Sequence, residues 1–378
     1  MIKLLINATG SSNWIGGLYH KKNILFSLLS NEWIRENCRI VLVTNPENRD
    51  VFADFGDKVK IKTITYKNVR IQKIKIALLM VLYGCDYVFP NIDSRICTKL
   101  HATGINWMPD YQHYYYPEYF TESDIQDRKQ ADIAAVESGY PLVLSSHACL
   151  DDFRKYVSKT KENVFVVPFV SYIEKEVRAL TDEYVRKVCE KYGTDPGGYI
   201  MVANQFWKHK NHTVVFEAIK TIAGKTAGDI KVLFTGKVDD YRDSDYADRM
   251  KQYLSDPTIS DSCICSGFID RKEQLALMKG ARFLIQPSMF EGWGTVLEDA
   301  KVLDKTVILS DIPVHREQMH DKSIIFKPDD PDELAKLIID NWSTQETNTD
   351  DISRGIDRMR REAKEYSMGM EELLKYAE

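Results

Sequence analysis

The stretch that decides the fold is RFLIQPSMFEGWGTVLEDAKVLDKTVILSD, residues 282–311. Two apolar runs, at 282–287 and 306–311, flank a glycine-bearing turn and a helical pattern. A strand–turn–helix–strand unit of this kind predicts parallel strands in an α/β fold. The start of such a helix has free backbone N–H groups that can hold a phosphate, and glycine lets a ligand approach the backbone closely. We expect this role for four consecutive residues: Gly292, Trp293, Gly294 and Thr295.

Two glutamates, Glu291 and Glu298, frame this turn. Their separation of seven residues is nearly two helical turns, so we expect both carboxylates on about the same side of the helix. One carboxylate could then hold sugar hydroxyls and the other a ribose. Alternatively, this is an ordinary helix N-terminus, where acids are favoured by the helix dipole. The spacing alone does not decide between these interpretations.

The same alternation of apolar runs and helical patterns extends along the chain, which favours two doubly wound, parallel-sheet domains of Rossmann-like type. The GTDPGG cluster at 193–198 is the strongest linker signal. We predict an N-terminal domain at 1–170, a C-terminal domain at 171–355, a linker at about 170–198 and a final helical stretch at 356–378 that returns to the N-terminal domain. The charged sequence at 351–378 suggests a helix pair with no strand after it. Strands are expected at 3–8, 39–44, 60–66, 87–92, 105–109, 142–146, 164–169, 199–204, 231–236, 263–268, 282–287 and 306–311.

Composition excludes several classes of protein. The 378 residues are 44% hydrophobic and 28% charged, with a net charge of −5, which is typical of a globular protein and gives no reason to expect nucleic acid as a partner. The seven cysteines have no zinc-site spacing, and Cys263 and Cys265 are expected to be buried on one strand. The N-terminus lacks the pattern of a signal peptide, and the longest apolar run, 76–84, is too short to span a bilayer, so we expect a cytoplasmic location.

Several motifs resemble glycosyltransferase family 4, the large retaining family of GT-B fold. SMFEGWGTVLEDA (288–300), followed by TVILSDIPVHREQ (306–318), resembles its Glu-x7-Glu signature, matched by Glu291 and Glu298. ANQFWKHKNHTVVFEAIK (203–220) resembles the first strand–loop–helix of its nucleotide domain, and Lys210 matches the lysine that grips the donor diphosphate. CSGFIDRKEQLALM (265–278) resembles the segment whose backbone, near Phe268 and Ile269, reads the nucleobase.

The resemblance continues in the N-terminal half. WMPDYQHYYYPEYF (107–120) is similar to a D-x-Q-H…PE-x-F stretch of many members, which places Asp110, Gln112 and His113 along a cleft between the two domains. In total the resemblance covers most of residues 105–315. It implies a GT-B fold with two domains facing a central cleft, and a sugar transferase that retains the anomeric configuration.

Two departures from the family pattern affect the predicted site. Many members have an arginine five residues before the diphosphate lysine, where this chain has Gln205, so the second cation must come from elsewhere, with Lys208 as a candidate. Many members also have a histidine just before the position of Asp110, where this chain has Pro109. Asp110 and His113 therefore both remain candidates for the group that touches the far side of the sugar.

A glycine pair, Gly16 and Gly17, follows the first predicted strand at a helix start. This is a usual place for phosphate or acceptor contact, although a simple turn is the alternative. The glycines here do not fit G-x-G-x-x-G, which disfavours a Rossmann-type oxidoreductase. His209 and His212 lack helical metal-pair spacing and are expected to pack the loop around Lys210, and His20 and His315 are expected to be structural.

Residues 57–76 hold seven basic side chains against one acid and lead into an apolar helix. A basic face with an apolar flank can rest on an anionic membrane. A solvated edge strand protected by lysines is the alternative. The resemblance favours the membrane, because many members use lipid-linked acceptors, and would place the protein at the inner membrane face.

The sequence therefore predicts a metal-independent, retaining glycosyltransferase without a cofactor. Its donor would be a UDP-, GDP- or dTDP-linked sugar and its acceptor a glycan or lipid-linked glycan, in polysaccharide biosynthesis for a bacterial surface glycan. The alternatives are an isomerase of nucleotide sugars with the same fold and a catalytically silent sugar-nucleotide-binding subunit. Residues predicted to be catalytic are Glu291, Lys210, Asp110 and His113. Residues predicted to bind substrate are Gly16, Gly17, Gln112, Gln205, Lys208, Phe268, Ile269, Gly292, Trp293, Gly294, Thr295 and Glu298.

Overall fold

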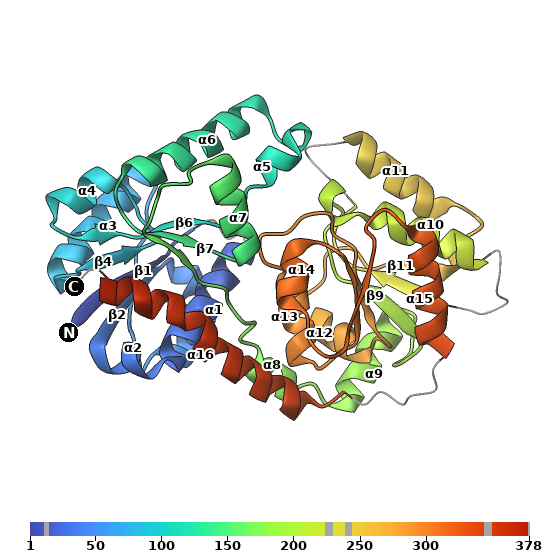
Figure 1. Ribbon diagram of the computed structural model, residues 1–378. Helices are drawn as coiled ribbons and strands as arrows, with labels where there is room; N and C mark the ends of the chain where they lie inside the picture. Colours follow the sequence, from blue (N-terminus) through green and yellow to red (C-terminus); the bar gives the residue numbers. More distant parts are fainter. Residues whose placement is uncertain (11–14, 224–229, 239–243, 344–349, 377–378) are drawn as a thin grey trace. The chain divides into compact units, whose positions relative to one another are not determined.

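A computed structural model describes residues 1–10, 15–223, 230–238, 244–343 and 350–376 (Figure 1). The chain divides into two compact units. Unit 1 comprises Met1–Tyr114, Glu122–Tyr172 and Arg360–Glu378, and unit 2 comprises Tyr115–Thr121 and Ile173–Met359. The expected boundary at residue 170 lies two residues before the division at Tyr172. The short segment 115–121 groups with unit 2 and not, as expected, with the N-terminal domain.

Unit 1 is built on parallel strands. A five-stranded sheet has the order β3-β2-β1-β4-β5, and a three-stranded sheet has the order β6-β7-β8. Leu4, Leu5 and Ile6 of β1 are fully buried, as the apolar run requires of a central parallel strand covered on both faces. The strands are β1 Ile2–Ala8, β2 Cys38–Thr44, β3 Lys60–Thr63, β4 Tyr87–Phe89, β5 Thr103–Gly104, β6 Asn106–Met108, β7 Leu142–Leu144 and β8 Val164–Val166.

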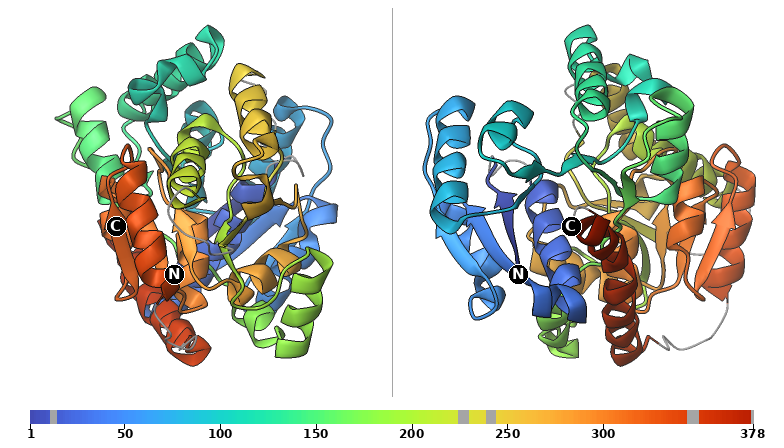
Figure 2. Two further views of the ribbon diagram at one scale, coloured as in Figure 1. Left: turned by 90° about the vertical axis from the view of Figure 1, so that its right-hand side faces the viewer. Right: turned by 60° about the vertical axis from the view of Figure 1, so that its left-hand side comes forward.

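Helices connect these strands (Figure 2). Two of them begin at a capping side chain: Asn68 accepts the Ile71 N–H at 3.0 Å before α3, and Ser146 accepts the Cys149 N–H at 3.0 Å before α7. The left-handed Gly84 ends α3, with φ of 59°. These helices are α1 Ile15–Ser30, α2 Glu32–Asn37, η1 Pro46–Phe55, α3 Val69–Tyr83, α4 Ser94–Lys99, α5 Gln112–Tyr115, α6 Glu122–Glu137 and α7 His147–Tyr156.

Unit 2 contains a six-stranded parallel sheet of order β11-β10-β9-β12-β13-β14. After β9 the chain builds outward through β10 and β11, and then returns to add β12, β13 and β14 on the other side. The order thus reverses between β9 and β12, and ligands of doubly wound sheets bind beyond the carboxyl ends of the strands at such a point. The strands are β9 Tyr199–Val202, β10 Lys231–Phe234, β11 Cys263–Cys265, β12 Leu284–Gln286, β13 Val307–Ser310 and β14 Ser323–Phe326.

The predicted linker is not an open connection. Residues 173–198 belong to unit 2 and contain α8 Glu174–Arg178 and α9 Asp182–Lys191, whose Val185, Val188 and Cys189 are buried. Helix α9 packs against α12, and the Gly- and Pro-rich residues 193–198 follow it. The other helices of unit 2 are η2 Pro117–Tyr119, η3 Lys208–Lys210, α10 His212–Ala223, α11 Ser244–Ser255, η4 Ser260–Ser262, α12 Arg271–Gly280, α13 Thr295–Val302, α14 Pro313–Gln318 and α15 Pro331–Ser343.

The final helix, α16 Ile352–Tyr376, is continuous, so the expected helix pair was wrong (Figure 2, dark red). Its first residues belong to unit 2 and the rest to unit 1. It approaches the backbone of each unit at a glycine. A Cβ at Gly355 would lie 2.1 Å from the Val302 carbonyl oxygen, and one at Gly369 would lie 2.1 Å from that of Val166. Glycine in a sequence usually indicates a helix break, but in α16 these two glycines allow close contact with a neighbouring backbone.

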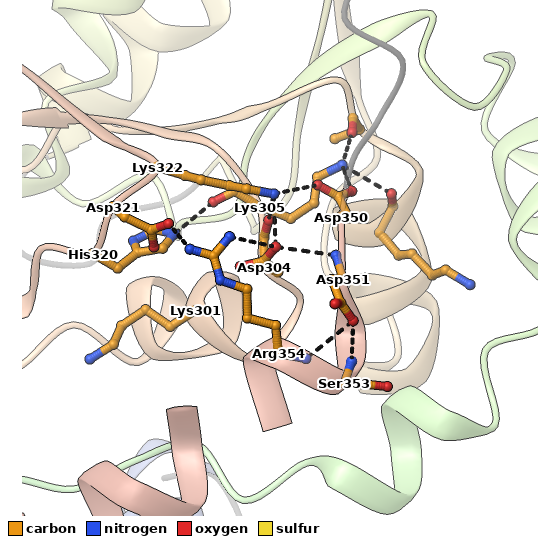
Figure 3. A network of polar contacts seen from close by, with 12 residues as sticks. Lys301, Asp304, Lys305, His320, Asp321, Lys322, Asp350, Asp351, Ser353 and Arg354 are labelled. Carbon is orange, nitrogen blue, oxygen red and sulfur yellow. Dashed lines mark hydrogen bonds and ion pairs between the residues drawn. The ribbon is translucent and has the colours of Figure 1, made fainter. Parts of the chain in front are cut away.

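A polar network holds the start of α16 to unit 2 (Figure 3). The fully buried Asp304, at φ of 54°, accepts from Lys322 at 2.8 Å, from Arg358 at 3.2 Å and from the Asp351 N–H at 3.1 Å. Beside it, the buried Lys305 pairs with Asp350 at 2.7 Å and donates to the Ala281 carbonyl. Burial opposes the charge on Asp304, but Lys322 and the Asp351 N–H outweigh it, so the pKa of Asp304 is lowered.

Two further expectations need correction. β14 was missed because its first three residues are only half-buried and its apolar run is short. Cys263 is half-buried and Cys265 is exposed, so the expected burial of both thiols was wrong. β11 is the edge strand of its sheet, which leaves one side open. Across the described residues, no helix has the length and apolar character needed to cross a bilayer.

Candidate active site

Two loops meet at the reversal point of the unit 2 sheet. One follows β9 and contains η3, and the other follows β12 and ends at α13. Hydrogen bonds join them: the Met289 N–H donates to the His209 carbonyl at 2.8 Å, and Asn211 Nδ2 donates to the Pro287 carbonyl at 3.2 Å. At the end of β12, Gln286 Oε1 accepts from Asn204 Nδ2 at 2.9 Å. The carboxyl ends of adjacent parallel strands thereby place the side chains of both loops in one site.

An ion pair lies at the centre of this site. Lys210 Nζ is 2.5 Å from Glu291 Oε1, and the side chains are only 14% and 9% exposed. The same oxygen accepts from Ser288 Oγ at 2.7 Å and from Gln286 Nε2 at 3.0 Å. Burial would raise the pKa of Glu291, but the charge of Lys210 outweighs it and lowers that pKa to about 2. Glu291 is therefore an oriented carboxylate that carries its charge at neutral pH.

A buried histidine lies behind this carboxylate. His315 Nδ1 is 2.9 Å from the Ser310 carbonyl and 3.1 Å from Ser310 Oγ, and Ser310 Oγ in turn donates to the Ser288 carbonyl at 2.5 Å. Burial lowers the pKa of His315, while Glu291 raises it by a smaller amount. The histidine is neutral at ordinary pH and supports the loop that carries Ser288 and Glu291, which agrees with its expected structural role.

Glu298 lies deeper than Glu291, with 1% of its side chain exposed. Its Oε1 accepts from Gln318 Nε2 at 2.9 Å and pairs with Lys301 Nζ at 3.2 Å. The expectation that a common helical period places both glutamates on one side was wrong, because α13 begins at Thr295 and Glu291 lies in the preceding loop. A role for Glu298 toward a ribose stays a prediction.

Gln318 fixes the backbone of the turn between Glu291 and Glu298. Gln318 bonds both backbone groups of Gly294, accepting its N–H at 2.8 Å and donating to its carbonyl at 3.1 Å. The N–H of Gly294 is therefore committed to Gln318, whereas α13 begins with no side-chain cap. N–H groups of an uncapped first turn are available to an anion. Gly292 and Thr295 are half-buried, and Trp293 is buried, with 9% exposed.

The η3 loop also carries Lys208, the second predicted cation. Lys208 Nζ lies 4.9 Å from the ring centroid of Tyr119. Gln205, at the position of the family arginine, accepts the Lys237 N–H through Oε1 at 3.0 Å. His209 is 7% exposed, and His212 is fully buried and stacks on Phe206 at 4.1 Å. Both histidines pack the loop as expected, and burial, with a smaller effect of Lys210, lowers the pKa of His212 to about 3.

The predicted base-reading residues lie between β11 and α12. Phe268 is 58% exposed and Ile269 is half-buried. Just beyond them, Arg271 pairs with the fully buried Asp299 of α13 at 2.5 Å. This ion pair ties the Phe268–Ile269 loop to the same helix whose N-terminus lies beside Glu291.

The predicted N-terminal residues lie in unit 1. Asp110 is 24% exposed and accepts from Arg128 Nη1 and from the Gln112 N–H, both at 3.1 Å. His113 is 1% exposed and lies 3.4 Å from Asp132, so its ring is inside the unit and Asp110 is the more accessible of the two candidates. Gln112 is also buried, at 7% exposed.

The glycine pair lies in the first turn of α1, where Gly16 is exposed and Gly17 is buried. A Cβ at Gly16 would meet nothing within 4 Å. Residues 11–14 of the same loop are outside the described residues. Over the ranges that the structure describes, no group of three or more His, Cys, Asp or Glu side chains could hold a metal ion. Metal independence stays a prediction.

Residues 188–358 match the family model of glycosyl transferases group 1. This match contains Lys210, Glu291 and Glu298, and the loops that carry them. It ends at Arg358, which anchors α16 to Asp304. No curated protein sequence matches the chain.

Solved structures share the fold over the whole chain. A glycosyltransferase from Rickettsia africae is 16% identical with a TM-score of 0.67, over 100% of this chain and 96% of that one. Anabaena HepE in complex with UDP is 13% identical with a TM-score of 0.68, over 100% of both chains. The sucrose-phosphate synthase of Thermosynechococcus elongatus is 14% identical with a TM-score of 0.65, over 100% of this chain and 99% of that one. The chain thus has the α/β, parallel-sheet fold of GT-B glycosyltransferases, as expected.

The sequence analysis missed several residues of this site: Gln286, Ser288, Gln318 and the Arg271–Asp299 pair. Gln286 and Ser288 were detectable in principle, because polar residues at the end of a buried strand are unusual and here follow an apolar run. Gln318 and Arg271 reach the site from other elements, so no local spacing could reveal them.

Proposed function

We propose that the chain is a retaining glycosyltransferase of family 4 type that moves a sugar from a nucleotide-sugar donor to a glycan or lipid-linked glycan. The observation that carries this proposal is the Lys210–Glu291 ion pair, placed beside the uncapped start of α13 within the group 1 match. The site combines a cation and N–H donors for a diphosphate with an ionised carboxylate for a sugar.

In the proposed reaction the bond between the anomeric carbon and the diphosphate oxygen breaks. Negative charge develops on the leaving diphosphate, where Lys210 Nζ and the first-turn N–H groups of α13 stabilise it. Lys208 adds a second cation in place of the family arginine at Gln205. No metal or cofactor is required by this scheme, because the charges of the site's own residues oppose that of the leaving group.

Glu291 faces the developing positive charge on the sugar. Its pKa of about 2 keeps it ionised, so it acts as a hydroxyl acceptor and electrostatic stabiliser, not as a general acid. The acceptor hydroxyl attacks from the side of the leaving group and passes its proton to the departing phosphate, which retains the configuration. In this proposal Asp110 contacts the sugar, Glu298 binds the donor ribose, and the Phe268–Ile269 backbone binds the base.

UDP-sugars are the first donors to test, since the HepE structure contains UDP. A panel of UDP-, GDP- and dTDP-sugars, with an oligosaccharide acceptor mixture, would be followed by NMR to assign the anomer of the first product. Transfer with retention supports the proposal. Conversion of the donor to an isomeric nucleotide sugar would identify an isomerase. If the donor binds but is not turned over with either lipid-linked or soluble acceptors, the chain would be a catalytically silent binding subunit.

A further inference from the structure

Helix α3 of unit 1 exposes an apolar stripe. Ile74, Leu78, Val81 and Leu82 are 58%, 64%, 62% and 71% exposed. At 100° per residue these positions lie within an arc of about 100° along one side of the helix. On the opposite side, Ile76 and Met80 are buried and pack against the first sheet. A helix that is apolar on both sides is normally buried, so the exposed side indicates a surface that is covered by something else.

The charged side chains of the segment that carries this stripe are all positive. Residues 58–83 contain seven Lys and Arg side chains and no Asp or Glu. Helical geometry places Arg70 and Lys75 on the two margins of the stripe. Lys62 from β3 lies 5.8 Å from the ring centroid of Tyr83, and Lys75 Nζ donates to the Thr65 carbonyl at 2.6 Å, so the β3 segment lies along α3.

The edge-strand interpretation explains only part of this pattern. β3 is the outermost strand of its sheet, so Lys60 and Lys62 also protect an open edge. Lys73 pairs with Asp93 at 3.1 Å and has a local partner. Neither fact accounts for the exposed leucines, which do not lie on β3. A partner that binds both the apolar stripe and its basic margins must have an apolar interior and a negatively charged surface.

We propose that the exposed side of α3 rests on an anionic lipid surface. Leu78, Val81 and Leu82 would enter the boundary between headgroups and acyl chains, while Arg70, Lys75 and Lys62 contact the lipid phosphates. The helix has 15 residues, fewer than the roughly 20 that cross a bilayer, and it lies in the plane of the surface. This inference goes beyond the proposed function and does not depend on it.

The test is co-sedimentation of the full chain with vesicles of phosphatidylcholine, alone or with one third phosphatidylglycerol. We expect binding to the anionic vesicles that weakens with added salt. The Leu78→Gln/Leu82→Gln variant should lose more than about tenfold in partition constant, since membrane binding scales with buried apolar area. The partition constant of the Arg70→Gln/Lys75→Gln variant should fall by about 25-fold, from about fivefold for each charge.

Matched controls come from α6, where Ile133 is 47% exposed and Lys129 is also exposed. Ile133→Gln and Lys129→Gln should leave vesicle binding unchanged. If the leucine variant does not fold, as judged by its thermal unfolding, the charge variant still tests the proposal. Absence of binding to anionic vesicles, or equal binding by both α3 variants and the wild type, would overturn it. So would a dimer, detected by sedimentation velocity, that the leucine substitutions dissociate without any vesicle binding.

Discussion

Lys210 Nζ lies 2.5 Å from Glu291 Oε1, although 81 positions separate the two residues in the chain. The pair exists because β9 and β12 are neighbours in the sheet and their loops end at the same edge. Each residue restrains the other, and both side chains are largely buried. The predictions below begin from this pair.

Glu291→Gln should reduce the rate of sugar transfer by about two to three orders of magnitude. The amide preserves the shape of the side chain but removes the charge that opposes the developing cation, and single electrostatic contacts of this kind contribute about 2.7–4 kcal/mol. The initial rate of donor turnover measures the effect. The matched control is Glu190→Gln on the exposed side of α9, which should leave the rate unchanged. A rate within a fewfold of wild type for Glu291→Gln would contradict the assignment.

Lys210→Met should destabilise unit 2 by about 3–5 kcal/mol, because it leaves the Glu291 carboxylate buried without its cation. Adding Glu291→Gln should restore much of this loss, since the amide carries no charge. A double-mutant cycle of denaturant unfolding free energies measures the coupling. Additive effects of the two substitutions would show that the two side chains do not interact.

The same pair predicts a pH dependence. The pKa of Glu291 is lowered from 4.5 to about 2, so the folded state favours its ionised form. Its contribution to stability is present above about pH 4.5 and is lost as the pH falls toward 2. Glu291→Gln should therefore flatten the acid limb of the stability curve relative to Glu190→Gln. An unchanged acid limb in the Glu291 variant would contradict the lowered pKa.

The buried Lys21 of α1 should make the unfolding free energy of unit 1 increase with pH. Burial lowers its pKa from 10.5 to about 7, and its Nζ lies 3.8 Å from the Trp107 ring centroid and 3.3 Å from His20 Nδ1. Between these two pKa values the unfolded chain binds more protons, so the unfolding free energy rises with pH. Lys21→Met should raise the melting temperature most below about pH 7 and progressively less toward pH 10. A constant difference over this range would contradict the prediction.

Gly355→Ala and Gly369→Ala should each destabilise the chain by at least about 1–3 kcal/mol, because the added methyl group would overlap a carbonyl oxygen. The melting temperature and the susceptibility of α16 to proteolysis measure the effect. Gly16→Ala is the matched control: it also adds a methyl group to a helix, but into open space, and should be neutral or slightly stabilising. Tolerance of alanine at both α16 positions would show that the helix does not approach the two backbones so closely.

Much of the fold was predictable because it depends on local signals. Buried parallel strands such as β1 and β9 are continuous apolar runs, and their alternation with helices indicates the fold class. The half-exposed β14 gave a weaker local signal, since tertiary packing stabilises it. The continuity of α16 depends on contacts with Val302 and Val166, which no spacing within the helix reveals.

The site was predictable where a motif carries it. Glu291 and Lys210 were identified through resemblance, and the structure brings them together. The hydrogen bonds of Gln318 to Gly294 and of Arg271 to Asp299 join segments that are 24 and 28 positions apart, and only the fold brings them into contact. His113 likewise lies buried beside Asp132, a neighbour that the sequence motif does not include.

The most direct test of the central claim is calorimetric binding of a nucleotide sugar and of its nucleoside diphosphate to the wild type and to Glu291→Gln. If Glu291 holds the transferred sugar, the sugar should tighten binding to the wild type, and this gain should vanish in the variant while the affinity for the diphosphate stays the same. An equal gain in both proteins, or no binding of any nucleotide sugar to the wild type, would contradict the account.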